Sequence, residues 1–148
     1  MNKVKIDTGA KSFEIEDLDG NVLGVFRFVP SDPGILNRYR ECAEFFNNLQ
    51  ELIGDREPEE YLPDLEAKAA EKIDLLFGAP VAENFFKIAS PFTMLEDGRV
   101  YAEAVIEVVG TIIEKEISVR QKKVDARMKK YTAKYLQNKK ETPEKKPE

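Results

Sequence analysis

Histidine and tryptophan are absent from this 148-residue chain, and cysteine occurs once, at Cys42. Without histidine the chain lacks the usual general base near neutral pH and the commonest ligand of transition metals. A single cysteine can form neither an internal disulfide nor a thiolate cluster. Paired carboxylates could still catalyse a reaction, but among 28 acidic residues some pairs lie close by chance. We therefore expect no catalytic residue, no metal site and no cofactor.

Long apolar runs are also missing. No stretch approaches the ~18 residues that would span a bilayer, and the first seven residues, MNKVKID, lack the apolar core of a signal peptide. Cys42 shares a helical pattern with Phe45 and Phe46, which favours a buried structural thiol over a reactive one. These features predict a cytoplasmic protein in a reducing compartment, with no membrane association.

Charge is divided unevenly along the chain. Residues 1–113 hold 11 Lys and Arg against 22 Asp and Glu, a net charge of −11, whereas residues 114–148 hold 12 against 6, a net charge of +6. Because the basic part continues an apolar pattern of helical period, it predicts a basic helix that projects from an acidic body. We expect three parts: an acidic α+β body at 1–117, a basic amphipathic helical arm at 118–137, and a disordered tail at 138–148.

The segment 12–29 predicts a β-hairpin. Phe13 and Ile15 alternate with glutamates, and a second run after the turn contains further alternating apolar residues. Asp19 and Gly20 lie between the two runs, and such a step tolerates the positive φ of a tight turn.

A first helix is expected to follow the hairpin. Asp32 can cap its free N–H groups, Pro33 has the φ of a first helical position, and Gly54 supplies the C-terminal stop. Its apolar stripe is expected to pack against the hairpin, and this stripe consists of Tyr39, Cys42, Phe46 and Leu49.

Two shorter helical patterns come next. An acidic connection at 55–62 precedes a second helix, which is expected to open near Pro63 and to end at Gly78. A short third helix is expected from Pro80.

The last helical pattern runs from Arg99 to about Leu136 without a proline. If continuous it is ~57 Å long, which exceeds what a body of this size can cover. Gly110 lies inside this pattern, where glycine costs about 1 kcal/mol, so we expect either a bend or close contact with another backbone there. Together the patterns predict a mainly helical α+β fold, with an N-terminal β-hairpin packed on three to four helices and a long C-terminal helix.

The arm holds the candidate partner-binding residues. They are apolar residues at helical spacing and basic residues between them: Ile117, Arg120, Lys123, Val124, Arg127, Met128, Tyr131 and Tyr135. This pattern is typical of a helix that docks on another protein, although a solvated helix folded on its own acidic body would share it.

Two other uses of the arm are disfavoured. The acidic body would repel nucleic acid, and no known nucleic-acid module is present. The apolar positions from 117 to 135 include no Trp, Phe or Leu, so insertion at a membrane surface would be weak.

Two stretches of the chain resemble a known family over roughly residues 12–117. The first is the hairpin followed by FRFVPSD at 26–32 and a helix containing Tyr39. The second contains IDLLFG at 73–78, Phe85-Phe86, Ser90-Pro91-Phe92 and Asp97-Gly98 before the terminal helix. Their order and spacing are similar to the small tail assembly chaperone-type proteins of long-tailed phages and prophages of Gram-positive bacteria, which are encoded between tail-tube and tape-measure genes.

The resemblance implies a non-catalytic protein of the bacterial host cytoplasm. Such a protein coats the long helical tape-measure protein while the tail tube assembles and is released before maturation. The opposite charges of body and arm further predict homo-oligomers that weaken as salt rises. The alternative is a small phage or bacterial regulator or inhibitor that binds nucleic acid, or a nucleic-acid enzyme, through the arm.

Overall fold

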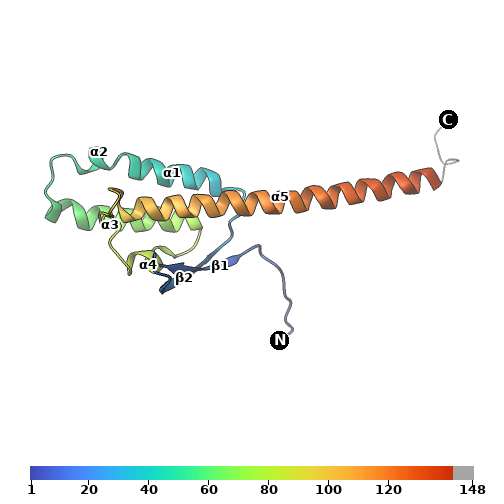
Figure 1. Ribbon diagram of the computed structural model, residues 1–148, viewed down its shortest axis with the longest axis horizontal. Coiled ribbons are helices and arrows are strands. Elements are labelled where there is room, and N and C mark those ends of the chain that lie inside the picture. The colour runs from blue at the N-terminus through green and yellow to red at the C-terminus, as the bar shows by residue number, and fades with distance from the viewer. Residues whose placement is uncertain (142–148) are drawn as a thin grey trace.

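The computed structural model describes the backbone of residues 1–141 and the side chains of residues 1–137. The fold is α+β, as predicted, with an N-terminal antiparallel hairpin followed by five helices, of which the last is by far the longest (Figure 1). Two of the five helices, α2 and α4, have only five residues each. In chain order the elements are β1 (Lys11–Glu16), β2 (Val22–Phe28), α1 (Ile35–Asn47), α2 (Leu49–Ile53), α3 (Pro58–Phe77), α4 (Ala82–Phe86) and α5 (Tyr101–Glu141).

The hairpin forms where its turn residues predict it. The Asp17 carboxylate accepts hydrogen bonds of 2.9 Å from the backbone N–H groups of Asp19 and Asn21, and Gly20 has a φ of 87°. The strand register shifts between Ile15 and Glu16, which marks a bulge beside the turn. The turn therefore fixes which face of the hairpin meets the core.

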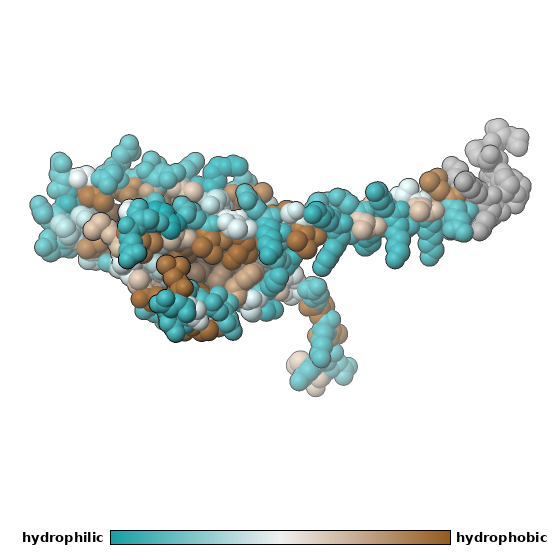
Figure 2. Space-filling view, in the orientation of Figure 1, coloured by the Kyte–Doolittle hydropathy of each residue, from teal (hydrophilic) through white to brown (hydrophobic). Residues whose placement is uncertain are grey.

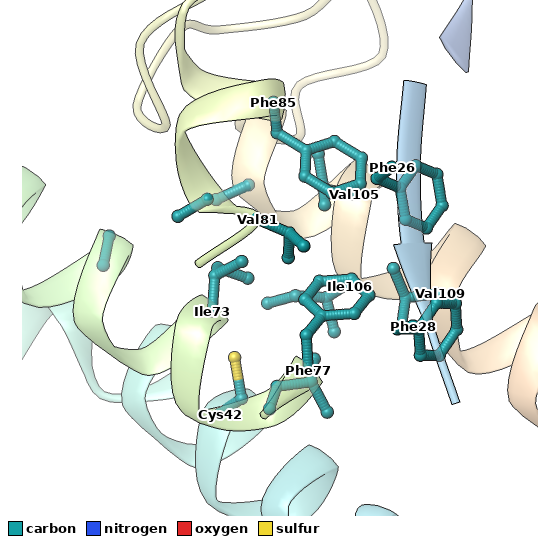
Figure 3. Close-up of a cluster of buried hydrophobic side chains, with 14 of the residues drawn as sticks. Phe26, Phe28, Cys42, Ile73, Phe77, Val81, Phe85, Val105, Ile106 and Val109 are labelled. Atoms are coloured by element: carbon teal, nitrogen blue, oxygen red, sulfur yellow. The ribbon is translucent and has the colours of Figure 1, made fainter. Parts of the chain in front are cut away.

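Phenylalanines join the hairpin to the helices. Phe26 of β2 lies 4.8 Å from Phe85 of α4 between ring centroids, and Phe28 meets Phe77 of α3 edge-on at 4.8 Å. Figure 3 shows these rings facing side chains of α5, among them Val109. All five residues belong to one core cluster of buried residues, so the hairpin is anchored by aromatic packing on three helices.

Helix α1 packs on α3 and α5, which corrects the expected packing of its stripe against the hairpin. In Figure 1, α1 and the hairpin lie on opposite sides of the pair formed by α3 and α5. Cys42 of α1 is buried on the α3 side of this core (Figure 3). Periodicity identified the buried face of α1 but could not identify the element that covers it.

Helix α3 begins at Pro58, five residues before the expected start at Pro63. Pro58 occupies the first turn, and Glu59 and Glu60 follow it there, which suits the positive end of the helix dipole. The residues expected to form an acidic connection are therefore largely the opening of a helix. Its end at Gly78, with a φ of 67°, agrees with the sequence.

Helix α5 is continuous over 41 residues, from Tyr101 to Glu141. It passes through Gly110 without the bend that the sequence left open, and the group closest to this glycine is the Tyr39 side chain rather than another backbone. The helix also continues beyond 137, which corrects the expected start of the tail at 138. The rest of that predicted tail, 142–148, lies outside the described residues.

Candidate protein-docking helix

Helix α5 has two parts with different surroundings. Val109 and Ile113 are fully buried in the core, and Ile117 is half-buried against it. From residue 121 to residue 137 every side chain is exposed, and Figure 1 shows this part extending alone from the body. We call residues 121–137 the exposed arm. Its exposure rules out the reading in which the arm folds back on its own acidic body.

A cluster of polar contacts fixes the base of the arm. Glu116 is buried (9% exposed) and accepts hydrogen bonds from Lys11 Nζ at 2.8 Å and from Arg120 at 3.3 Å. Arg120 also donates to the Gly9 carbonyl oxygen at 2.9 Å and to Ser31 Oγ at 2.7 Å. We call these five residues the root cluster, because they tie the N-terminal segment and the entry to α1 to α5.

The charged groups of the root cluster stabilise one another in their ionised forms. The hydrogen bond from Lys11, together with the positive charges of Lys11 and Arg120, lowers the pKa of the Glu116 carboxyl below its usual value. A carboxylate that stays ionised keeps both cations in place at neutral pH. The orientation of α5 relative to the body is thus set by ion pairs as well as by the apolar core.

The eight predicted partner-binding residues divide between these two parts. Ile117 and Arg120 are engaged by the body, so neither is free to meet a partner in this conformation. The other six belong to the exposed arm: Lys123, Val124, Arg127, Met128, Tyr131 and Tyr135.

Four apolar residues form a stripe along the exposed arm. Their exposed fractions are large: 43% for Val124, 52% for Met128, 70% for Tyr131 and 58% for Tyr135. They are spaced by four, three and four residues, which is the spacing that keeps side chains on one seam of a coiled coil. We call these four residues the arm stripe. Leu136, which is 52% exposed and was not among the predicted partner-binding residues, extends the apolar surface at the end of the arm.

The arm stripe has two chemically different edges. Four cations stand at three- and four-residue steps on one side of the helix, and they are Lys123, Arg127, Lys130 and Lys134. On the other edge, Gln121 donates a hydrogen bond of 3.0 Å to Asp125. Figure 2 shows the arm as a mainly hydrophilic rod with isolated hydrophobic side chains. The arm therefore offers a partner an apolar seam with a basic border.

The single cysteine is poorly placed to act as a nucleophile. Burial raises the pKa of the Cys42 thiol to about 12, so the thiolate is scarce at neutral pH. Within the described part of the chain, no group of three or more acidic or cysteine side chains is arranged to hold a metal ion. No helix among residues 1–141 combines the length and the apolar character that crossing a bilayer requires.

Comparison with known proteins gave no match: no family model fits the chain, and neither curated proteins nor solved structures include one similar to it at the significance required. The geometry of the exposed arm therefore carries the functional argument.

Proposed function

We propose that this protein is a non-catalytic binding protein that docks on a helical segment of another protein through its exposed arm. The observation that carries the proposal is the arm stripe, four large apolar side chains held on a continuous helix that its own body leaves uncovered. A helix in water is stabilised chiefly by packing of its apolar face. The arm lacks such packing within the chain, and a partner helix would provide it.

The spacing of the arm stripe specifies the kind of partner. Alternating steps of three and four residues match the seam of a two-helix coiled coil, in which each side chain inserts between four residues of the facing helix. Arg127 and Lys134 flank this seam at one edge, seven residues apart. A partner with acidic residues beside its own apolar seam would complement them, and a basic partner would be repelled.

The specific form of this function that we propose is tail assembly chaperoning. The resemblance to that family supports it, and so does the order of a hairpin, short helices and a long terminal helix. A tape-measure protein is a long helical client, and the exposed arm would contact successive segments of it with moderate affinity. A protein with this task needs no catalytic centre.

The docking function is tested with a designed peptide of about four heptads that carries Leu on its seam and Glu at both flanking positions. The glutamates also discourage the peptide from pairing with itself. In a fluorescence-anisotropy titration we expect saturable binding of this peptide, and at least tenfold weaker binding when its glutamates are replaced by lysines. Equal binding of the two peptides, or binding of neither, would contradict the proposal.

Paired variants locate the contact on the arm. Replacing Met128 and Tyr131 by alanine is expected to weaken binding of the acidic peptide at least tenfold, because both side chains lie on the seam. The matched control replaces Lys122 and Lys129 by alanine, which alters the arm but leaves its stripe intact. Binding that survives the first change would place the docking surface elsewhere.

The chaperone assignment has its own test. The reading frame that follows this gene is expected to encode a very long helical protein, and segments of that protein are expected to co-purify with the full chain after co-expression. If the chain binds the acidic peptide but none of these segments, the docking function stands and the tail-assembly assignment fails.

A further inference from the structure

A second surface of the molecule complements the arm. Between α1 and α5 the body has a hollow of about 270 Å³. It is lined by Leu36, Tyr39 and Ile113, which we call its apolar floor, by Gly110 and Thr111, and by two carboxylates of α5, Glu107 and Glu114. Leu36 is 53% exposed, so its side chain adds apolar surface to the hollow. We call this hollow the acidic groove.

Both carboxylates of the groove act on the Tyr39 side chain. Burial is the main cause that raises the pKa of the Tyr39 phenol, and the charges of Glu107 and Glu114 raise it further. Glu107 already accepts a hydrogen bond from Arg99, whereas Glu114 forms no ion pair within the described part of the chain. The groove thus combines an apolar floor with a negative border.

The exposed arm carries charges of the opposite sign to those of the acidic groove, at the same spacing. Glu107 and Glu114 are seven residues apart on α5, and Arg127 and Lys134 are also seven residues apart. Seven helical residues rise ~10.5 Å in both cases. Two cations beside an apolar stripe therefore match two carboxylates beside an apolar floor, pair for pair.

The arm cannot enter the groove of its own chain. Groove and arm lie on one continuous helix, α5, so residues 127 and 134 remain more than a full helical turn beyond Glu114 along the same axis. Any arm that occupies the acidic groove must come from another molecule.

We propose that the acidic groove receives the exposed arm of a second copy of this chain, so that copies assemble head to tail. Arg127 and Lys134 of one copy pair with Glu114 and Glu107 of the next, while the arm stripe covers Leu36 and Tyr39. The contact joins two different surfaces of the chain, so a linear assembly keeps one free arm at one end and one free groove at the other unless a ring closes. The same exposed arm is used in the proposed function, but here the arm binds a second copy of this chain instead of a different protein.

The energetic character of this contact follows from its composition. The four charges are exposed, and at physiological ionic strength exposed charges are screened over ~8 Å. The apolar floor is small, so association is expected to be weak and to depend strongly on salt. Sedimentation velocity of the full chain is expected to show oligomers that grow with protein concentration at about 50 mM salt and dissociate at about 500 mM salt.

Charge reversals test both surfaces. The groove variant carries Glu107→Lys and Glu114→Lys, and the arm variant carries Arg127→Glu and Lys134→Glu. Each is expected to remain monomeric at low salt, because like charges then face one another at the contact.

Matched controls apply the same change in net charge to other exposed sites. Glu60→Lys with Glu71→Lys alters α3, and Lys122→Glu with Lys129→Glu alters the side of the arm away from its stripe. Both controls are expected to oligomerise within about twofold of the unmodified chain.

Mixing the two monomeric variants gives the decisive measurement. The groove variant retains a normal arm and the arm variant retains a normal groove, and the reversed groove and the reversed arm also carry opposite charges. An equimolar mixture is therefore expected to form oligomers in which the two variants alternate, although each variant alone is monomeric. A chain with all four reversals is expected to recover the oligomers, because the two charge patterns are then exchanged.

Three results would overturn the inference: a monomeric unmodified chain at low salt, oligomers that persist in the groove variant, or no association in the mixture. The groove variant must still bind the acidic peptide used to test the docking function, because its arm is unchanged. Failure of head-to-tail assembly is therefore distinguishable from failure of the docking function.

Discussion

The hydroxyl oxygen of Tyr39 lies 2.6 Å from the point that a Cβ atom on residue 110 would occupy. Two carbon atoms of the Tyr39 ring lie within 3.1 Å of the same point. Gly110 therefore gives the Tyr39 ring its place against α5, and this close approach explains a glycine inside an otherwise regular helix.

Replacing Gly110 by alanine is expected to lower the free energy of unfolding by about 1–2 kcal/mol, because the new methyl group overlaps the Tyr39 ring. In an exposed helix the same substitution would stabilise by about 1 kcal/mol. Urea unfolding of the single variant measures the first effect. In a Tyr39→Ala background the sign is expected to reverse, and destabilisation of similar size in both backgrounds would show that the ring is not the obstacle.

A chain that ends after Gln121 is expected to keep a fully folded body. The exposed arm makes no contact that the core requires, so thermal unfolding should shift by less than about 4 °C, which corresponds to roughly 1 kcal/mol for a body of this size. Adding Arg120→Ala to the shortened chain is expected to lower the midpoint by several degrees more, since it removes the bonds to Gly9 and Ser31. A fall of more than about 10 °C on truncation alone would mean that the arm belongs to the core.

Acid is expected to loosen the root cluster. The pKa of Glu116 is lower in the folded protein than its ordinary value of 4.5, chiefly because Lys11 donates a hydrogen bond to it. Its contribution to stability is therefore present above about pH 4.5 and is lost as the pH falls through the folded pKa. Urea unfolding is measured between about pH 7 and about pH 3. The free energy of unfolding is expected to fall less steeply with falling pH for Glu116→Gln than for the unmodified chain.

A second substitution identifies the cause of that slope. In a Lys11→Gln background, the difference between Glu and Gln at position 116 is expected to shrink, because the largest cause of the lowered pKa is gone. An unchanged difference would assign the effect to Arg120 instead.

Nucleic acid is expected to bind weakly. The exposed arm offers four cations on one side, Arg120 is committed to the root cluster, and the body is acidic. At most about four phosphate contacts would give a dissociation constant near 10⁻⁴ M or weaker at physiological salt. Anisotropy titrations with a random duplex and a random single strand measure this, and saturation below about 1 μM would favour the regulator hypothesis instead.

The sequence predicted features that depend on neighbouring residues. Asp19 and Gly20 placed the hairpin turn, and Gly78 placed the end of α3, because both glycines adopt the positive φ that their positions require. Gly54 was expected to end the first helix, but that helix ends at Asn47, and Gly54 follows the separate short helix α2. The helical pattern on both sides of Gly110 was also predicted, although the sequence left open whether the helix is continuous there. In each case the controlling chemistry lies within a few residues.

Features that join distant segments were not predicted. Lys11 and Glu116 are 105 residues apart, and no local pattern indicates that they meet. Val105, Val109 and Ile113 could equally have formed an exposed oligomer surface, but other elements cover them in the core. Pro58 was read as part of a connection because Pro63 offered an equally good helix start.

The same limit applies to the candidate site. Apolar spacing identified the arm stripe, since helical periodicity alone places its residues on one seam. It could not separate Ile117 and Arg120 from the stripe, because both are held by residues that are distant in the sequence. Arg120 bonds to Gly9 and Ser31, and Ile117 packs against the core. It also gave no reason to associate Leu36 with Glu114 in one hollow.

The continuity of α5 has a mechanical consequence. A flexible linker would let a captured partner turn freely, but α5 is a single helix of ~60 Å whose base is fixed by the core and the root cluster. Rotation of the body about this axis must therefore turn the arm stripe through the same angle. The arm stripe therefore faces a fixed direction relative to the body. Any partner bound to the arm is held at a defined orientation and a defined distance from the acidic body.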